Sequence, residues 1–366
     1  MDTQYAIIGG GVVGVSVAYG LQRLGCQTVV LDEGDTALRA SRGNFGLVWV
    51  QSKGLDSPHY AQWSQQSAAL WPGLADELEQ QTGINIHLQQ KGGFDFHFSE
   101  ASLQQRVDQY TELKDKLAGN YPFEVLNAAQ LKKEEPAIGP KVVGAILHHQ
   151  DGHVNPLRLF NALHQAHHQL GGQLQSQGKV QSVTAVKGGY RIECSHGKSV
   201  LAEKVIICAG LGSNRFAEQL GFTSRVLPIR GQNIVTERIP TFMHRPSMTI
   251  RQVNEGSVQL GDSKEDVGFD DGTTMDITAK IANRAVSTYP CLGKVRMLRS
   301  WGALRIMSPD GLPIYAQSSK NPGCYWMTCH SGITLAAVHS QLLPLWLEGN
   351  ENAPNLEKFD EKRFHI

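Results

Sequence analysis

Four residues near the start of the chain have the types and the spacing that hold a dinucleotide. Gly9, Gly11 and Gly14 form a Gly-x-Gly-x-x-Gly run, and Asp32 follows 23 residues after Gly9. The first glycine permits a tight turn, the second admits a pyrophosphate to the backbone, and the third lets a helix pack closely on a strand. An acid at the place of Asp32 accepts hydrogen bonds from a ribose hydroxyl. The alternative is that these glycines serve only the packing of a helix on a strand.

A dinucleotide site of this kind needs a strand, a turn and a helix in that order, and the flanking sequence predicts them. Residues 4–8 and 28–31 are apolar runs typical of buried parallel strands, and residues 12–24 carry apolar side chains at helical spacing before Gly25. A loop over residues 34–46 follows, where an NAD enzyme usually continues into further βα units. The small side chains and glycines of this loop favour the flat ring system and ribityl chain of FAD. An ordinary surface connection is the alternative.

Parallel-sheet signatures recur at the start, the middle and the end of the chain, with antiparallel signatures between them. Besides the first unit, they are the apolar run 205–210 and the strand 324–328, which leads through a glycine turn into a helix over 334–347. The other predicted elements are helices over 59–81, 101–118 and 157–170, a loop over 131–140, and strands over 92–98, 179–186, 189–194, 226–236, 247–252 and 257–260.

This alternation predicts an α/β fold with two interleaved domains. One domain is expected over residues 1–84, 145–222 and 296–366, and the other over residues 85–144 and 223–295.

Composition and charge exclude several classes of protein. Hydrophobic residues make up 41% of the 366 residues, which suffices for a sizeable core and excludes a mostly disordered chain. The 34 Lys and Arg balance the 34 Asp and Glu, so no basic field directs the chain to nucleic acid. The apolar stretch 5–21 is interrupted by five glycines, which argues against a membrane span. Asp2, with no Lys or Arg near it, argues against a cleavable signal, so a cytoplasmic location is expected.

Cysteine usage favours reduced thiols in the core. The cysteines are scattered in a long chain, mostly within apolar runs, at Cys26, Cys194, Cys208, Cys291, Cys324 and Cys329. Cys324, Cys329 and His330 lie close enough in sequence to raise the question of a metal. No second Cys/His cluster supplies the missing ligands, so we predict no metal site.

Motifs along nearly the whole chain resemble those of the FAD-dependent amino-acid and amine oxidases, the family of glycine oxidase, sarcosine oxidase and D-amino-acid oxidase. The run 9–14 with Asp32 resembles the family's FAD fingerprint, and residues 40–47 resemble its second flavin loop. Residues 300–313 resemble a signature that precedes the active site. Residues 330–336 resemble the closing turn whose backbone amides face the pyrimidine edge of the flavin.

This resemblance implies that residues 1–84, 145–222 and 296–366 form an FAD-binding Rossmann-like domain of the glutathione-reductase type. It implies that residues 85–144 and 223–295 form a mixed, mainly antiparallel α+β domain that binds the substrate.

The resemblance also implies bound FAD and the residues that hold it. They are Gly9, Gly11, Val12, Val13, Gly14, Asp32, Glu33, Ala40, Ser41, Asn44, Phe45, Gly46, Leu47, Val180, Ala209, Gly210, Gly302, Ser331, Gly332, Ile333 and Thr334. The stretch 301–303 lacks the cysteine that carries the flavin in the sarcosine oxidase branch, so non-covalent FAD is expected. Gln259 stands where that branch has a lysine that helps oxygen react with reduced flavin. The electron acceptor, oxygen or another, therefore stays open.

Arg305 is the predicted ligand of a substrate carboxylate, because a guanidinium binds a carboxylate through two hydrogen bonds. The resemblance places an arginine in this signature for that role, and the alternative is a salt bridge to an acid such as Asp310. His330 is predicted to hydrogen-bond the substrate or tune the flavin, with a structural or solvent-facing histidine as the alternative. His153 and Arg230 are further candidates, although Arg230 is more typical of a residue that holds the sheet together.

The sequence therefore predicts an FAD-dependent oxidase or dehydrogenase of a small amino acid or secondary amine that carries a carboxylate. A hydride passes from the neutral amine to flavin N5 without a general base, and the imine product hydrolyses. Oxygen, giving H2O2, or another acceptor reoxidises the flavin.

Residues 152–156 and 261–269 resemble a bacterial subgroup that includes opine oxidase and a glycine-to-cyanide dehydrogenase. The resemblance implies a homo-oligomer or an electron-accepting partner subunit. The alternatives are a flavoenzyme that oxidises 2-hydroxy acids and a flavoprotein subunit that needs its partner.

Overall fold

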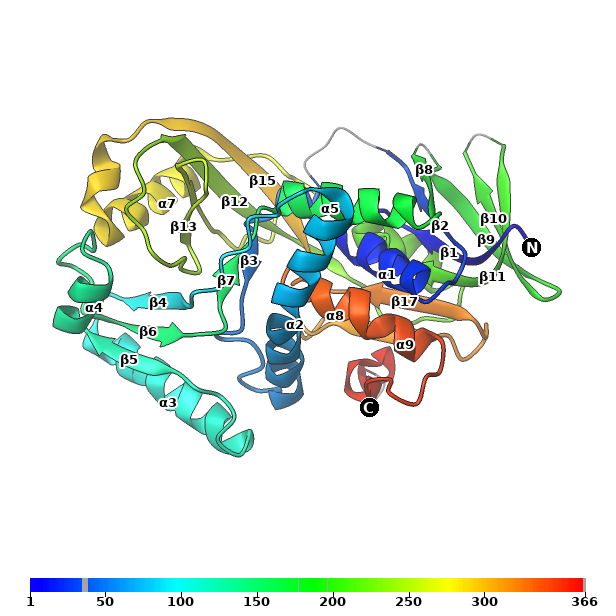
Figure 1. The fold of residues 1–366 in the computed structure, drawn as a ribbon, viewed down its shortest axis with the longest axis horizontal. Coiled ribbons are helices and arrows are strands. Elements are labelled where there is room, and N and C mark those ends of the chain that lie inside the picture. Colours follow the sequence, from blue (N-terminus) through cyan, green and yellow to red (C-terminus); the bar gives the residue numbers. More distant parts are fainter. Residues whose placement is uncertain (35–38, 177, 196, 365–366) are drawn as a thin grey trace.

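The computed structural model, which describes residues 1–34, 39–176, 178–195 and 197–364, has two lobes joined by long strands (Figure 1). One lobe contains an eight-stranded sheet in the order β16-β17-β11-β1-β2-β8, with β10 and β9 added beside β11. Its strands are β1 (Thr3–Ile8), β2 (Thr28–Asp32), β8 (Gln173–Ser176), β9 (Val180–Val186), β10 (Gly189–Cys194), β11 (Ser199–Ile207), β16 (Ile314–Gln317) and β17 (Cys324–Thr328). The strands from β17 to β8 run parallel, so their carboxyl ends share one edge of the sheet, where such sheets bind ligands.

The central strand β1 is buried on both faces, which requires an apolar residue at nearly every position. Ala6 and Ile8 belong to the core on one face, and Tyr5 and Ile7 belong to the core on the other. The helices of this lobe are α1 (Val12–Arg23), α2 (Pro58–Thr82), α5 (Pro156–Gln169), α8 (Ala336–Gln341) and α9 (Leu343–Leu347). Helix α1 packs between the sheet and helices α5 and α8 (Figure 1).

The second lobe combines two smaller antiparallel sheets with three helices. The four-stranded sheet, β13-β14-β12-β15, consists of β12 (Leu227–Arg238), β13 (Ile250–Gln252), β14 (Ser257–Leu260) and β15 (Met297–Met307). The three-stranded sheet, β4-β6-β5, consists of β4 (Gly93–His97), β5 (Glu124–Asn127) and β6 (Gly144–His148). The helices are α3 (Glu100–Lys116), α4 (Ala128–Glu134) and α7 (Met275–Thr288). One apolar core, which includes Phe94, Leu147, Ile234 and Ile281, joins both sheets to α7.

A two-stranded pair lies at the junction of the lobes (Figure 1). It is made of β3 (Leu47–Val48) and β7 (Gly152–His153), which pair antiparallel. The remaining short elements are α6 (Asn214–Ala217), η1 (Gly210–Ser213), η2 (Pro290–Lys294), η3 (Glu357–Phe359) and η4 (Glu361–Phe364). Among the described helices, none has the length and apolar character needed to cross a membrane.

The predicted α/β fold class is confirmed, with three local corrections. Residues 131–134 are the end of helix α4 rather than a loop, because Asn127 and Gln130 form a reciprocal capping box. Strand β6 pairs with β4 and β5, and β15 pairs with β12, so both strands leave the predicted cofactor domain for the sheets of the second lobe. Cys291 is exposed, whereas the other five cysteines are buried as expected.

Candidate active site

The glycine run forms the turn between β1 and α1 that the sequence predicts. Gly9 has a φ of +105°, and a Cβ there would stand 2.5 Å from the Cys208 carbonyl oxygen. Gly14 packs so closely on the strand that a Cβ would overlap the Gly9 carbonyl oxygen. Gly11 is the N-cap of α1, and among the described residues a Cβ there would meet only Ser41 Oγ, at 3.1 Å. The first turn of α1, which is fully described, carries no acidic side chain, so the positive end of the helix dipole is open to a phosphate.

Asp32 ends β2 directly beside this turn. Its Oδ2 accepts a hydrogen bond from the Gly10 amide at 2.8 Å. The adjacent Glu33 forms an ion pair with Lys179, with 3.1 Å between Oε2 and Nζ, and Lys179 precedes Val180 at the start of β9. The acid and the start of β9 therefore lie at the same edge of the sheet as the N-terminus of α1.

The loop over residues 40–47 runs from this turn to the junction of the lobes. Ser41 Oγ accepts a hydrogen bond from the Val12 amide at 2.9 Å, and Ala40 precedes it. Further on, Asn44 Oδ1 accepts from the Gly46 amide at 2.7 Å, and Gly46 takes a φ of +88°. The loop therefore begins against helix α1 and ends in strand β3 between the lobes.

Two further predicted segments border the same region. Ala209 follows β11, and its Cα lies 2.9 Å from the place of a Cβ on Gly9. The neighbouring Gly210 has a φ of +56°, and a Cβ there would stand 3.3 Å from Ile306 Cγ1 of β15. Gly302, also on β15, lies beneath the backbone of residues 271–272, where a Cβ would stand 2.5 Å from two carbonyl oxygens.

The segment that follows β17 returns to the first helix, as predicted. A Cβ on Gly332 would stand 2.7 Å from Val12 Cγ1 and 3.5 Å from Val13 Cγ2. Thr334 Oγ1 donates to the Leu47 carbonyl oxygen at 3.2 Å. Residues 9–14, 40–47 and 330–334, which are far apart in the sequence, therefore meet around one place in the fold.

Arg305 lies on β15 and is held by protein groups. Its Nη2 forms an ion pair with Asp262 Oδ2 at 2.7 Å, and its Nη1 donates to the carbonyl oxygens of Ser263, at 2.6 Å, and Arg230, at 3.3 Å. Burial lowers the pKa of Arg305, although the negative charge of Asp262 opposes the shift. The Nε–H and one Nη2–H have no acceptor among the described residues, so these two donors remain for a ligand.

Arg305 forms a salt bridge, as the alternative prediction states, but its partner is Asp262 and not Asp310. Asp310 instead pairs with Arg363, with 2.7 Å between Oδ2 and Nε. The 19% exposure of the Arg305 side chain leaves it accessible from the solvent side.

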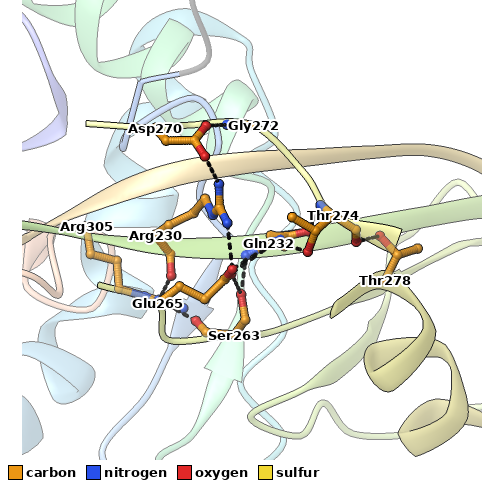
Figure 2. A network of polar contacts seen from close by, with 9 residues as sticks. All are labelled: Arg230, Gln232, Ser263, Glu265, Asp270, Gly272, Thr274, Thr278 and Arg305. Atoms are coloured by element: carbon orange, nitrogen blue, oxygen red, sulfur yellow. Dashed lines mark hydrogen bonds and ion pairs between the residues drawn. The ribbon is translucent and has the colours of Figure 1, made fainter. Parts of the chain in front are cut away.

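Arg230 serves to hold the second lobe together. Figure 2 shows its guanidinium between Glu265, at 2.7 Å, and Asp270, at 2.5 Å. Gln232 Nε2 also donates to Glu265, at 3.0 Å. Burial acts to raise the pKa of Glu265, but the hydrogen bonds it accepts, that from Arg230 first among them, together hold this pKa below its usual value. This network fixes the segment 262–274 over β12 and brings Asp262 to Arg305.

His330 lies among positive charges at the start of the closing turn. Its Nδ1 lies 3.1 Å from Ser331 Oγ, which also accepts a hydrogen bond from Lys53 Nζ. Burial lowers the pKa of His330 to about 3, and the charges of Lys53, Arg305 and Lys264 add to the shift. The ring is therefore neutral in a positive field.

The comparisons with known proteins agree with this geometry. The family model described as "FAD dependent oxidoreductase" matches residues 4–343. This chain belongs to that family. One subunit of the opine oxidase of Agrobacterium tumefaciens (strain Ach5) is 40% identical over 365 residues, which cover 100% of this chain and 98% of the relative. Hydrogen cyanide synthase subunit HcnC of Pseudomonas aeruginosa is 28% identical over 94% of this chain and 95% of its own. The crystal structure of glycine oxidase from Geobacillus kaustophilus superposes with a TM-score of 0.91 at 24% identity, covering 99% and 98% of the two chains.

The residues present fit the FAD that this family of oxidoreductases binds. The positive end of α1, the backbone of Gly11 without a Cβ and the carboxylate of Asp32 match a pyrophosphate and a ribose. Residues 44–47 and 330–334, which meet at the junction of the lobes, would hold the flavin ring. Once bound, FAD supplies the acceptor for two electrons, and the protein supplies binding and electrostatics.

Three charged residues of this region escape prediction from the sequence. Lys53 reaches Ser331 from a loop, and Asp262 reaches Arg305 through the pairing of β12 with β15. Arg251 is buried beneath the loop 44–47 and bonds to Gln259. Of the residues in these contacts, only Gln259 could be singled out from the sequence, because it stands where the sarcosine oxidase branch has a lysine. The other contacts depend on tertiary packing.

Asp151 gives a test of the buried electrostatics beside the site. It is fully buried, accepts hydrogen bonds from the Val50 amide and Gln51 Nε2, and burial raises its pKa to about 7 against these bonds. Between about pH 4 and 7 the native state holds a proton that the unfolded state has lost, so stability falls as pH rises. Relative to Asp151→Asn, the wild type should lose on the order of 4 kcal/mol of unfolding free energy across this window.

The measurement is denaturant unfolding of both proteins from pH 4 to 8. Asp115→Asn, at an exposed position, is the matched control and should give a curve parallel to the wild type. Parallel curves for wild type and Asp151→Asn would contradict the assignment.

Proposed function

We propose that this flavoenzyme oxidises the C–N bond of a small amino acid or secondary amine that carries a carboxylate, by hydride transfer to the bound FAD. The observation that carries the proposal is the meeting of the residues 9–14, 40–47 and 330–334 beside Arg305 and His330. The imine product hydrolyses in water, and oxygen or another acceptor takes the electrons.

Arg305 is proposed to bind the substrate carboxylate through its free Nε–H and Nη2–H. Asp262 and the two carbonyl oxygens hold the guanidinium in place from its other side. A guanidinium fixed in this way loses little conformational entropy when it binds a carboxylate through two hydrogen bonds. The proposed role of Asp262 is therefore to position Arg305.

The positive field around His330 is proposed to favour the reactive form of the substrate. Only a neutral amine can release a hydride, because its nitrogen lone pair stabilises the developing iminium. Burial is the main cause of the lowered pKa of His330, and the charges of Lys53, Arg305 and Lys264 add to it. The same charges disfavour a substrate ammonium at this place. The site thus needs no general base in order to deprotonate the amine.

Anaerobic absorption spectroscopy tests the proposal. The purified protein is expected to be yellow, and an amino or imino acid from a panel of amino acids, N-alkyl amino acids and opines should bleach it without oxygen. Hydroxy acids tested beside these amines distinguish the 2-hydroxy-acid alternative. A protein that is isolated without flavin and cannot take it up would overturn the proposal.

We also propose that the chain works with a partner subunit that accepts its electrons. Its support is the 40% identity, over the full chain, with a relative named as one subunit of an opine oxidase. The isolated chain should then reduce a redox dye rapidly in the presence of substrate and react slowly with oxygen. Fast turnover with oxygen alone would contradict this partner role.

His330 is expected to remain neutral throughout the working pH range. Because its pKa is lowered to about 3, the pH profile of kcat/KM should contain no limb from this ring between about pH 5 and 8. His330→Asn should lower kcat/KM roughly tenfold without changing the shape of the profile. The exposed His168→Asn is the control and should change neither. A limb near neutrality that disappears in His330→Asn would show that the ring titrates during turnover.

A further inference from the structure

A buried arginine that has no counter-ion in the described part of the chain lies against the loop that borders the proposed flavin site. Arg251, on β13, is 3% exposed, and its donors meet only neutral groups. Nε and Nη2 donate to Gln259 Oε1 at 3.0 and 2.7 Å, and Nη1 donates to the Val154 carbonyl oxygen at 3.0 Å. None of the described carboxylates lies within 4 Å of the guanidinium. Burying an unpaired charge is costly, so its retention indicates an anion elsewhere in the working cycle.

The groups around Arg251 leave its charge uncompensated. His153 Nδ1 lies 3.2 Å from Nη1, and burial together with Arg251 lowers the pKa of His153 to about 3, so this ring is a neutral acceptor. Burial lowers the pKa of Arg251 to about 9, although the charge of Glu255 opposes the shift. Arg251 therefore stays protonated at neutral pH.

The position of Arg251 indicates which anion it serves. Nη2 lies 2.9 Å from the place of a Cβ on Gly46, and the guanidinium carbon lies 5.8 Å from the centre of the Phe45 ring. Both residues immediately precede Leu47, which bonds to Thr334 of the closing turn. A substrate enters from solvent, where Arg305 is accessible, whereas Arg251 contacts the wall of the cofactor site from within the protein.

We propose that Arg251 is the buried counter-charge for the negative charge that FAD gains on reduction, an inference that rests on the flavin site of the proposed function. A neutral amine that gives up a hydride becomes an iminium cation, and the hydride brings two electrons, one proton and hence one negative charge to the flavin. Charge and atoms balance without another reactant. A fixed cation beside the ring stabilises the reduced form over the oxidised form, because its attraction acts in a region of low dielectric.

The pairing of β13 with β14 supplies a matched pair of variants. Arg251 and Gln259 lie opposite each other in register. Arg251→Met removes the charge, whereas Gln259→Glu neutralises it in place by providing a carboxylate within bonding distance of the guanidinium. Arg251→Lys retains the charge and is the control.

The experiment measures the holoenzyme with two probes that require no amine substrate: the dissociation constant of sulfite, which adds to oxidised flavin and leaves it anionic, and the two-electron reduction potential. Both Arg251→Met and Gln259→Glu should weaken sulfite binding and disfavour flavin reduction roughly tenfold, a shift of about −30 mV. Arg251→Lys should stay within about threefold of the wild type.

Unchanged sulfite affinity and potential in both neutralising variants would overturn the proposal, and so would a raised substrate KM with the potential unchanged. If Arg251→Met cannot be obtained with bound FAD, Gln259→Glu alone decides the matter. Should no amine bleach the flavin while the sulfite effect is present, the proposed substrate chemistry fails and the role of Arg251 stands.

Discussion

Arg305→Ala is expected to lower kcat/KM for every active substrate about 100-fold. The variant loses two charge-assisted hydrogen bonds to the substrate carboxylate, which together contribute on the order of 3 kcal/mol. Without these bonds the substrate carboxylate binds more weakly, so KM rises. The reacting C–H bond is also oriented less well, so kcat falls. Steady-state kinetics with the substrate identified by anaerobic bleaching measures it.

Two further variants separate substrate binding from general damage. Arg305→Lys keeps the charge but loses the planar fork, so its kcat/KM should lie between those of wild type and Arg305→Ala. Arg363→Ala breaks an ion pair of the same kind, to Asp310 in the same signature segment, and should leave kcat/KM unchanged. Equal kcat/KM in wild type and Arg305→Ala would remove Arg305 from this role.

Gly11→Val should abolish tight FAD binding while the chain still folds. The backbone at Gly11, with φ of −68° and ψ of 177°, suits any residue. In the described part of the chain, a Cβ there meets only Ser41 Oγ, at 3.1 Å. The valine side chain instead occupies the space at the helix N-terminus, where the pyrophosphate approaches the backbone. We expect the dissociation constant of FAD to rise about 100-fold, the loss of roughly 3 kcal/mol of contacts.

The measurement is FAD titration of the apoprotein, with circular dichroism to show that it is folded. Gly73→Ala is the matched control, because Gly73 lies on helix α2 and, apart from its chain neighbours and its own helix backbone, no described residue comes within 4 Å of an added Cβ. This change should leave FAD binding unaltered and stabilise the helix by about 0.5–1 kcal/mol. A folded Gly11→Val protein that binds FAD as tightly as the wild type would place the pyrophosphate elsewhere.

Local patterns were sufficient to predict the first unit of the fold. The apolar run of β1, the glycine turn and the helix from Val12 follow from periodicity and backbone sterics within about 30 residues, and the structure matches them closely. The helix over 157–170 was also predictable, since Asn155 caps it and Pro156 occupies its first position. These periodicity and capping patterns involve residues that are close together in the sequence, so they can be recognised without knowing the tertiary structure.

The charged surroundings of the site depend on contacts that no local pattern specifies. Asp262 meets Arg305 across 43 residues because β12 pairs with β15 and the segment 262–274 folds back over them. The sequence offered Asp310, which is nearer in the chain, but that acid faces Arg363. Lys53 meets Ser331 across 278 residues, and only the packing of the two ends of the chain brings them together.

The same limit applies to the division into domains. The pattern of strands indicated two interleaved units, but the pairing partners of β6 and β15 depend on register across the second lobe. A strand at the end of one predicted segment can therefore belong to the neighbouring sheet, as both of these do.

A crystal structure of the protein with FAD and an unreactive carboxylate analogue of its substrate tests the central claim most directly. The account predicts the pyrophosphate at the N-terminus of α1, the flavin ring between residues 44–47 and 330–334, and the analogue's carboxylate on Nε and Nη2 of Arg305. A ring bound away from these two segments, or a carboxylate bound elsewhere while Arg305 turns from the flavin, would contradict it.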